Sequence, residues 1–156
     1  MAHLIGAIPA PLHRGVLRIG HRLRIAWWRW RRRCRLGVSI IARDDAGRVL
    51  LVRQSYGSGG WHLPGGGMRA GEEPTAAAAR EFGEELRCAI ADLQLLDVRE
   101  EHFHGGLHRV HLVVGRVTGA PRPDGREVVE ARLFAPDALP ADTGRRARKR
   151  LALLAR

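Results

Sequence analysis

Three glutamates, Glu81, Glu84 and Glu85, are crowded into the stretch REFGEE at residues 80–85. Residues 75–86 are rich in helix formers and contain no proline, so they predict an α-helix. At about 100° per residue, the three carboxylates fall on one face of that helix. Hard oxygen ligands at fixed spacing suit Mg²⁺ or Mn²⁺. A solvated acidic face is the alternative, because like charges at these spacings cost only about 0.2 to 0.5 kcal/mol per pair.

The neighbouring residues position such a site. Another side of the predicted helix carries an apolar stripe that would face the core, made of Thr75, Ala79, Phe82 and Leu86. Immediately upstream, the segment LPGGG at residues 63–67 contains three successive glycines. Glycines after a proline allow a sharp turn and a close approach of the backbone to a ligand. Oxygen ligands beside an open backbone favour a metal site that acts on phosphates.

The spacing of these residues resembles the Nudix box, the signature of the Nudix hydrolases. Gly66 is followed after five residues by Glu72, and after seven more by REFGEE, so that seven of nine defined positions match. Two positions depart: Arg87 stands in place of a glycine and Cys88 in place of a bulky aliphatic residue. Glycine at a helix C-terminus normally provides a left-handed cap, so we expect the difference to affect the exit from the helix.

The resemblance implies an α/β fold, an α/β/α sandwich around a mixed β-sheet. It extends from about residue 36 to residue 140. Residues 1–34 are expected to form a basic N-terminal extension with an amphipathic helix, and residues 35–156 a Nudix hydrolase domain that ends in a helix. In the extension, Pro11 can open the helix, and apolar residues recur at three- and four-residue steps up to Trp30. Its tryptophans would pack on the domain, or stack on nucleic acid, or lie at a membrane surface.

The local patterns predict the other elements of the domain. Strands are expected at 36–42, 49–54, 68–70, 93–103, 109–117 and 128–134. Residues 119–125, GAPRPDG, are expected to be a flexible loop. A C-terminal helix is expected to begin with Asp142 or Thr143 as its cap and to bury a stripe made of Ala147, Leu151 and Leu154.

The resemblance also implies a reaction, the hydrolysis of a pyrophosphate bond in a small nucleoside diphosphate-X substrate with Mg²⁺ or Mn²⁺. Glu84, Glu85 and the carbonyl of Gly65 are implied as metal ligands. Glu81 is implied either as a further ligand or as the proton acceptor. Arg80, counted among the catalytic residues, and Glu72 are expected to orient the glutamates.

Further residues are implied in substrate binding and catalysis. Gly66, Gly67 and Arg53 would contact phosphate, although Arg53 could equally be a solvated arginine at a strand end. Glu127 follows the 119–125 loop, where many family members supply another catalytic carboxylate. Its competitors for that role are Glu100, Glu101 and Glu130.

A second cluster of possible ligands occurs in EEHFHGGLHRVH, which contains His102, His104, His108 and His111. Imidazoles beside acids could form a transition-metal site, but the alternation of side chains along a hairpin explains them more simply. Trp61 or Phe103 could stack on a base, although packing is the commoner role of such residues. The markers of several substrate classes are missing, which leaves a nucleoside triphosphate or a nucleotide sugar as the expected substrate.

The formal charge of +11 is unevenly distributed along the chain. Residues 1–43 contain ten arginines and no acid, residues 44–144 contain all sixteen acids, and residues 145–156 contain six basic residues. The expected catalytic region is therefore acidic and the termini are basic. This pattern leaves open an RNA 5′-end pyrophosphohydrolase, with the basic termini on the phosphate backbone, as a less favoured alternative. A non-catalytic nucleotide-binding module is a third possibility.

Cys34 and Cys88 lack metal-type spacing, which favours a reducing compartment, and we expect a cytoplasmic protein. No apolar run approaches the length of a membrane span, and the N-terminus does not resemble a secretory signal. An arginine-rich, acid-free start is compatible with a transit peptide. A homodimer, with the N-terminal helix exchanged between partners, is an open possibility.

Overall fold

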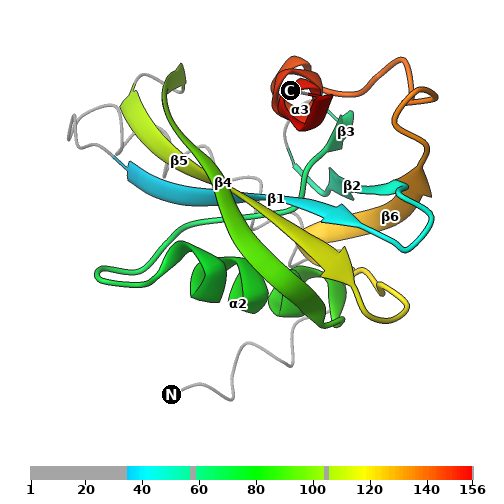
Figure 1. Ribbon diagram of the computed structural model, residues 1–156, viewed down its shortest axis with the longest axis horizontal. Helices are drawn as coiled ribbons and strands as arrows, with labels where there is room; N and C mark the ends of the chain where they lie inside the picture. Colours follow the sequence, from blue (N-terminus) through cyan, green and yellow to red (C-terminus); the bar gives the residue numbers. More distant parts are fainter. Residues whose placement is uncertain (1–34, 57–58, 104–105, 156) are drawn as a thin grey trace.

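The computed structural model describes residues 35–56, 59–103 and 106–155 (Figure 1). The predicted N-terminal extension, residues 1–34 with its amphipathic helix, lies outside the described residues, as does His104. Within the described residues, no helix is long and apolar enough to span a bilayer.

Six strands form one mixed sheet. They are β1 (Arg35–Arg43), β2 (Val49–Gln54), β3 (Trp61–His62), β4 (Ile90–Phe103), β5 (Gly106–Val117) and β6 (Val128–Phe134). The order is β3-β2-β1-β5-β4, with β6 paired to β2. β1 and β5 are parallel, whereas the other described pairs are antiparallel.

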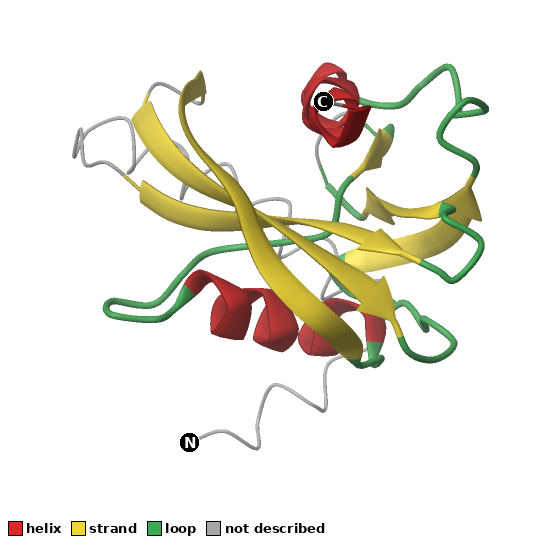
Figure 2. Ribbon diagram, in the orientation of Figure 1, coloured by secondary structure: helices red, strands yellow, loops and turns green. Residues whose placement is uncertain are grey.

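Helices cover both faces of the sheet (Figure 2). Helix α2 (Pro74–Leu86) lies on one face, and α3 (Arg145–Leu151) with the 3₁₀ turn η2 (Ala152–Ala155) lies on the other. In β2, Leu50 and Val52 join the core cluster under α2, while Val49 and Leu51 join the cluster under α3. Because successive strand residues point to opposite faces, a continuous apolar run such as VLLV predicts a strand covered on both sides. The predicted α/β/α sandwich is confirmed.

The sheet divides into two halves where the glycine loop enters. β1 pairs with β2 only at Arg43 and Val49, close to their connecting turn. Further along β1, residues 64–68 take the place of a neighbouring strand. The Gly66 carbonyl accepts the Val38 N–H at 2.9 Å, and the Pro64 carbonyl accepts the Ile40 N–H at 2.9 Å. The loop is thereby fixed between the halves of the sheet, beside α2.

Several local predictions are wrong. Residues 68–70 form no strand, since only an isolated bridge joins Gly67 to Gly37, and the two-residue strand β3 was too short to be recognised. The buried face of α2 includes Ala77 and Ala78, whereas Thr75 is half-buried and Ala79 exposed. Phe82 and Leu86 of the predicted stripe are buried as expected, so the prediction is wrong only in the N-terminal half of the helix.

The C-terminal helix also begins later than predicted. Gly144 is its N-cap, and neither Asp142 nor Thr143 takes that role. The backbone is held instead by the Gly144 N–H, which donates to the Trp61 carbonyl at 2.8 Å. The predicted apolar stripe is confirmed, because Ala147 is buried and Leu151 and Leu154 pack against the same cluster.

Candidate active site

Helix α2 carries the acidic cluster. It begins at Pro74, whose missing N–H is not needed in a first turn, and it ends at Leu86. Arg87 follows in the left-handed conformation with φ of 49°, and its N–H donates to the Gly83 carbonyl at 3.0 Å. The substitution of arginine for glycine therefore keeps the left-handed exit, at the cost of a conformation that side chains with a Cβ rarely adopt.

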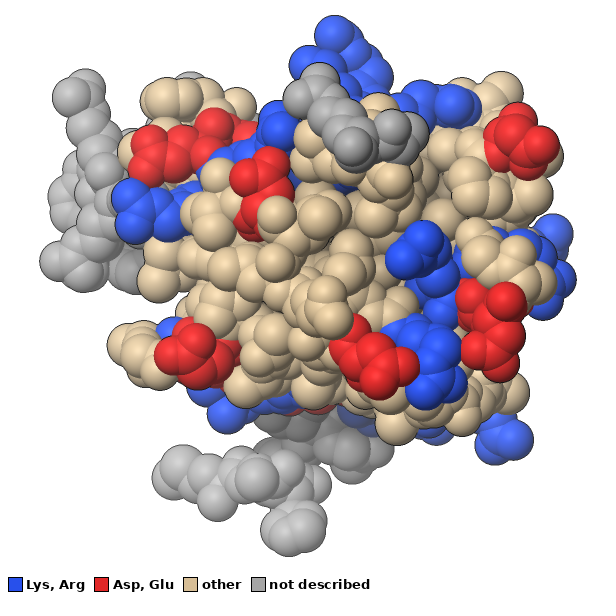
Figure 3. Space-filling model, viewed as in Figure 1, with Lys and Arg blue, Asp and Glu red and all other residues tan. Residues whose placement is uncertain are grey.

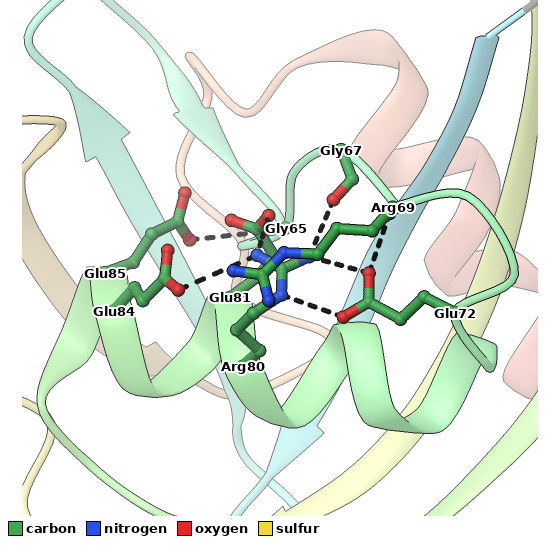
Figure 4. Close-up of polar contacts among 8 residues, drawn as sticks. All are labelled: Gly65, Gly67, Arg69, Glu72, Arg80, Glu81, Glu84 and Glu85. Carbon is green, nitrogen blue, oxygen red and sulfur yellow. Dashed lines mark hydrogen bonds and ion pairs between the residues drawn. The ribbon is translucent and has the colours of Figure 1, made fainter.

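The three glutamates have different environments along one side of α2 (Figure 4). The side chain of Glu84 is 60% exposed and that of Glu81 is 16% exposed. Glu85 is only 4% exposed and lies at the edge of the core beside Leu86. A solvated acidic face does not describe this arrangement, because only Glu84 is largely in water.

Burial raises the pKa of the Glu85 carboxyl to about 8. The Gly65 N–H, which donates to Glu85 Oε2 at 3.2 Å, opposes that rise. The carboxylates of Glu81, Glu127 and Asp124 add to it. The buried Glu85 carboxyl therefore has several acids and little positive charge near it. A bound cation would offset the repulsion among these carboxylates and favour the ionised form of Glu85.

Arg80 organises the opposite side of the cluster. Its Nε and Nη2 donate to Glu72 Oε1 and Oε2 at 2.8 and 2.9 Å, and its Nη1 donates to Glu81 Oε1 at 2.7 Å. Nη2 also donates to the Gly67 carbonyl at 2.9 Å. These bonds lower the pKa of Glu72 to about 2 and raise that of Arg80. The orientation of Glu81 by Arg80 and Glu72 agrees with the geometry expected of a positioning pair.

The glycine loop fits closely around the same residues. Gly65 has φ of 140°, and a Cβ there would lie 2.2 Å from the Val38 carbonyl oxygen. A Cβ on Gly66 would lie 2.4 Å from Glu81 Oε2, so glycine is required to admit that carboxylate. Gly67 has free space around it. The Gly66 carbonyl accepts the Val38 N–H and the Gly67 carbonyl accepts Arg80 Nη2. Phosphate oxygens are acceptors, so a phosphate contact by either glycine would use its N–H group.

The connection between β5 and β6, residues 118–127, lies against the C-terminal end of α2. The Asp124 N–H donates to the Glu85 carbonyl at 2.9 Å. The Asp124 carboxylate accepts the N–H groups of Arg126, Glu127 and Val128 at 2.9 to 3.1 Å. Glu127 is thereby held near enough to Glu85 to raise its pKa. Asp124 was missed in the sequence, although the Pro-Asp-Gly turn signal pointed to it.

The competitors of Glu127 are engaged elsewhere. Glu100 pairs with Arg109 at 2.8 Å, and Glu101 pairs with Arg150 at 2.9 Å, both away from α2 on β4. Glu130 on β6 pairs with Arg132 at 2.7 Å. Of the four candidates, Glu127 alone has its charge next to Glu85.

Arg53 lies on the α3 side of the sheet. Its guanidinium stacks on Trp61 at 4.6 Å from the ring centroid and pairs with Asp142 at 2.7 Å and Glu130 at 3.5 Å. Trp61 also packs edge-on against Phe134 at 4.9 Å and is buried. These contacts support the packing role of Trp61. They also show that Arg53 is held by neighbours rather than solvated as a free strand-end residue.

The chemistry of the donors, rather than a finished ligand shell, points to a cation. Among the described residues, no three His, Cys, Asp or Glu side chains converge as a set of metal ligands, at α2 or in the histidine-rich hairpin. At α2, the Arg80 guanidinium contacts Glu81, and Glu84 extends into solvent. The available donors are nevertheless all carboxylate and carbonyl oxygens around a buried acid, and this set fits Mg²⁺ or Mn²⁺.

Comparisons with known proteins agree with this geometry. The chain is 39% identical over 66 residues to an RNA pyrophosphohydrolase of Saccharophagus degradans, a match that covers 42% of this chain and 39% of that relative's length. It is 38% identical over 99 residues to the "Putative 8-oxo-dGTP diphosphatase 2" of Mycobacterium tuberculosis, covering 60% of this chain and 70% of that one.

Solved structures resemble the whole domain. The MutT NUDIX hydrolase from Burkholderia pseudomallei superimposes with a TM-score of 0.71 at 27% identity, over 78% of this chain and 98% of that chain. The family model described as the NUDIX domain matches residues 34–154. The chain, which has the box, the helix and the sandwich in their expected places, belongs to the NUDIX hydrolase family.

Proposed function

We propose that this chain hydrolyses a pyrophosphate bond in a nucleoside diphosphate linked to another group, with a divalent metal ion. The family and the names of the relatives indicate that the chain is a hydrolase of phosphoric anhydrides. The observation that carries the proposal is the buried Glu85 carboxyl, surrounded by Glu81, Glu127 and Asp124 beside the glycine loop. A purely structural acid at this place would be expected to have a basic partner.

Glu84, Glu85 and the Gly65 carbonyl would hold the ion, with Glu81 as a further ligand or as the base. The bound ion would neutralise charge on the phosphoryl oxygens and favour ionisation of the attacking water. Arg80 keeps Glu81 directed at the glycine loop, because its guanidinium joins Glu81 to Glu72 and to the Gly67 carbonyl. If Glu81 is the base, it accepts the proton of the attacking water on the carboxylate oxygen that Arg80 does not contact. Glu127 would supply a second carboxylate to the same space.

The test is phosphate and pyrophosphate release from a panel of nucleoside triphosphates, nucleotide sugars, dinucleotides and 5′-triphosphate RNA. Each assay contains Mg²⁺ or Mn²⁺, and wild type is compared with Glu84→Gln. Glu84 is the safest of the three acids to change, because it is largely exposed and its nearest ionic partner is 3.8 Å away. We expect turnover of one class by the wild type and a loss of at least about 100-fold in the variant.

Glu73→Gln is the matched control. Glu73 precedes the same helix, is exposed and makes no side-chain cap bond, so its change removes an equal charge without touching the cluster. Equal activity in the two variants would contradict the proposed role of Glu84. Metal binding without turnover of any substrate would instead favour the nucleotide-binding module.

A nucleoside triphosphate or a nucleotide sugar is the first substrate to test, because the oxygen donors of the described site suit a metal-bound pyrophosphate and the described residues do not point to a particular base. The relatives are named "RNA pyrophosphohydrolase" and "Putative 8-oxo-dGTP diphosphatase 2", so both sizes of substrate belong in the panel. Cys34 and Cys88 lack metal-type spacing in the sequence, and Cys88 is free in the structure, so a reducing, cytoplasmic location stays part of the proposal.

A further inference from the structure

A basic groove lies between the end of β4 and α3. It is open to solvent, has a volume of about 410 Å³, and is lined by residues 99–102 of β4 and by Arg146, Lys149 and Arg150 of α3. That volume is within the range of ligand sites. Lys and Arg side chains cover the top of the molecule over α3 (Figure 3). None of these residues belongs to the acidic cluster of α2.

The two carboxylates in the groove are already neutralised. Glu101 pairs with Arg146 at 3.2 Å and with Arg150 at 2.9 Å, and Glu100 pairs with Arg109, outside the groove, at 2.8 Å. Glu101 therefore serves to hold two arginines of α3 in place. Four basic side chains against two acids leave the groove positive.

Unused donors remain in this arrangement. The Arg150 side chain is 14% exposed. Among the described residues, only its Nη2 donates hydrogen bonds, one to each carboxylate oxygen of Glu101. Its Nη1 and Nε are left for a ligand. Lys149 is exposed and makes no ion pair in the described part of the chain. A fixed guanidinium with spare donors beside a mobile ammonium is suited to phosphate oxygens.

The position and extent of the charge favour a chain of phosphates over a single nucleotide. Helix α3 contains five basic residues in seven positions and no acid, so the positive surface continues past the groove. The groove lies on the α3 face of the sheet, whereas the acidic cluster lies on α2, which covers the other face. Each helix layer lies on the order of 10 Å from the sheet, so α2 and α3 are separated by about twice that distance. A ligand that reaches both must therefore be longer than one nucleotide.

We propose that the basic groove binds the phosphate backbone of an RNA whose 5′ end is hydrolysed at α2. This inference rests on the proposed pyrophosphohydrolase activity and names its substrate class. Lys149 and Arg150 contact backbone phosphates downstream of the reacting end. The groove then selects RNA ends over free nucleotides by affinity, without reading the sequence.

The experiment uses the full chain and two charge-reversal variants. Lys149→Glu changes the groove, and Arg43→Glu is the control. The Arg43 side chain is likewise exposed and without an ionic partner among the described residues. Arg43 ends β1, whereas Glu101 is aligned, through His108 of β5, with Arg35 at the start of β1. The first measurement is binding of a labelled ten-nucleotide 5′-hydroxyl RNA by fluorescence anisotropy at 50 and 200 mM salt. The second is KM for nucleoside triphosphate and for 5′-triphosphate RNAs of two and ten nucleotides.

We expect Lys149→Glu to weaken RNA binding and to reduce the salt slope by about 1. The wild type should then lose about threefold more affinity than the variant between the two salt concentrations. KM should rise for the ten-nucleotide RNA and stay unchanged for the nucleoside triphosphate, and Arg43→Glu should behave as wild type.

Two results would overturn the assignment. Equal losses in Lys149→Glu and Arg43→Glu would mean that overall charge, and not the groove, attracts RNA. A rise in KM for the nucleoside triphosphate as large as for RNA would make the groove part of a small-nucleotide site. Because the 5′-hydroxyl RNA cannot be hydrolysed, binding that depends on Lys149 without turnover of any substrate would support the groove while refuting the proposed activity.

Discussion

At the scale of single residues, Glu85 has almost no contact with water, and within the described residues it accepts a hydrogen bond only from the Gly65 N–H. Ionising such a group in the folded protein is unfavourable without a cation. In the unfolded chain the carboxyl ionises at its ordinary pKa of 4.5, whereas in the fold the pKa is about 8. The metal-free fold should therefore be destabilised by the same acid that a metal-dependent reaction would need.

This difference predicts a pH dependence of stability in EDTA. Below pH 4.5 both states are protonated and the fold suffers no penalty from Glu85. As pH rises from 4.5 to 8, the unfolded state releases a proton that the fold retains, so the free energy of unfolding falls, by up to about 5 kcal/mol. Glu85→Gln should flatten this slope and raise metal-free stability at pH 8 while abolishing activity. Urea unfolding at pH 5 and pH 8 measures both effects.

Glu73→Gln controls for the loss of one negative charge on the same helix, and it should retain the wild-type slope. A Glu85→Gln profile that fell as steeply as wild type would show that another group is responsible. Added Mg²⁺ should stabilise the wild type more than Glu85→Gln at pH 8, because only the wild type has a carboxylate at position 85 to bind the ion.

Arg87 provides a second test at this scale. A left-handed residue with a Cβ, such as Arg87, costs the fold about 1 to 2 kcal/mol, and glycine would remove that cost. Part of this stabilisation is lost again, because glycine has more conformational freedom in the unfolded chain. Arg87→Gly should therefore stabilise the protein by about 0.5 to 1 kcal/mol in urea unfolding. Arg87→Ala, which removes the arginine but keeps the Cβ, should give no such gain. If alanine stabilised as much as glycine, the backbone explanation would fail.

At the scale of elements, the 118–127 connection is fastened to α2 through Asp124. Asp124→Ala removes a carboxylate that accepts three backbone N–H groups, and we expect a loss of about 1 to 3 kcal/mol in stability. Activity should fall with it, because the backbone of Glu127 is no longer held. Limited proteolysis between residues 118 and 127 should become faster.

Asp124→Asn is the conservative partner, since its amide oxygen can still accept part of these bonds, and it should recover some of the lost activity. Unchanged kcat in Asp124→Ala would mean that Glu127 does not contribute to the reaction. A fall in kcat for Glu127→Gln with normal stability would separate its chemical role from the fold of the connection.

Elements with strong local signals were predicted well from the sequence. Strands β2 and β6 have the predicted bounds, and α2 begins one residue earlier than expected. Failures occur where tertiary contacts override local preference. Strand β3 has two residues, which is too few for a period to appear. Helix α3 starts at Arg145, after the N-cap Gly144, because of a backbone contact from Gly144 to Trp61 that no local pattern encodes. The neighbourhood of Glu85 and Glu127 depends on how the 118–127 connection folds back, so spacing alone could not distinguish Glu127 from Glu130.

At the scale of the whole molecule, the family model matches residues 34–154, and in the described part of the chain both core clusters are made of residues between 38 and 154. We therefore expect a chain lacking residues 1–33 to fold cooperatively and to retain activity on a nucleoside triphosphate. Circular dichroism during heating and the assay measure these properties. Mass in solution, compared with that of the full chain, tests the possibility of a homodimer that depends on the N-terminal segment. Loss of cooperative unfolding would contradict the independence of the domain.

The pairing of residues 64–68 with β1 also bears on how the family can vary. A loop hydrogen-bonded in register along a strand cannot gain or lose one residue without moving every carbonyl to the wrong partner. Insertions in this segment should be rejected, whereas the turn at residues 44–47, which projects from the sheet, should accept them. In a library of single-residue insertions scored for folding, we therefore expect no tolerated insertion in residues 64–68. By this criterion the glycine loop behaves as an inner strand of the sheet rather than as a connection.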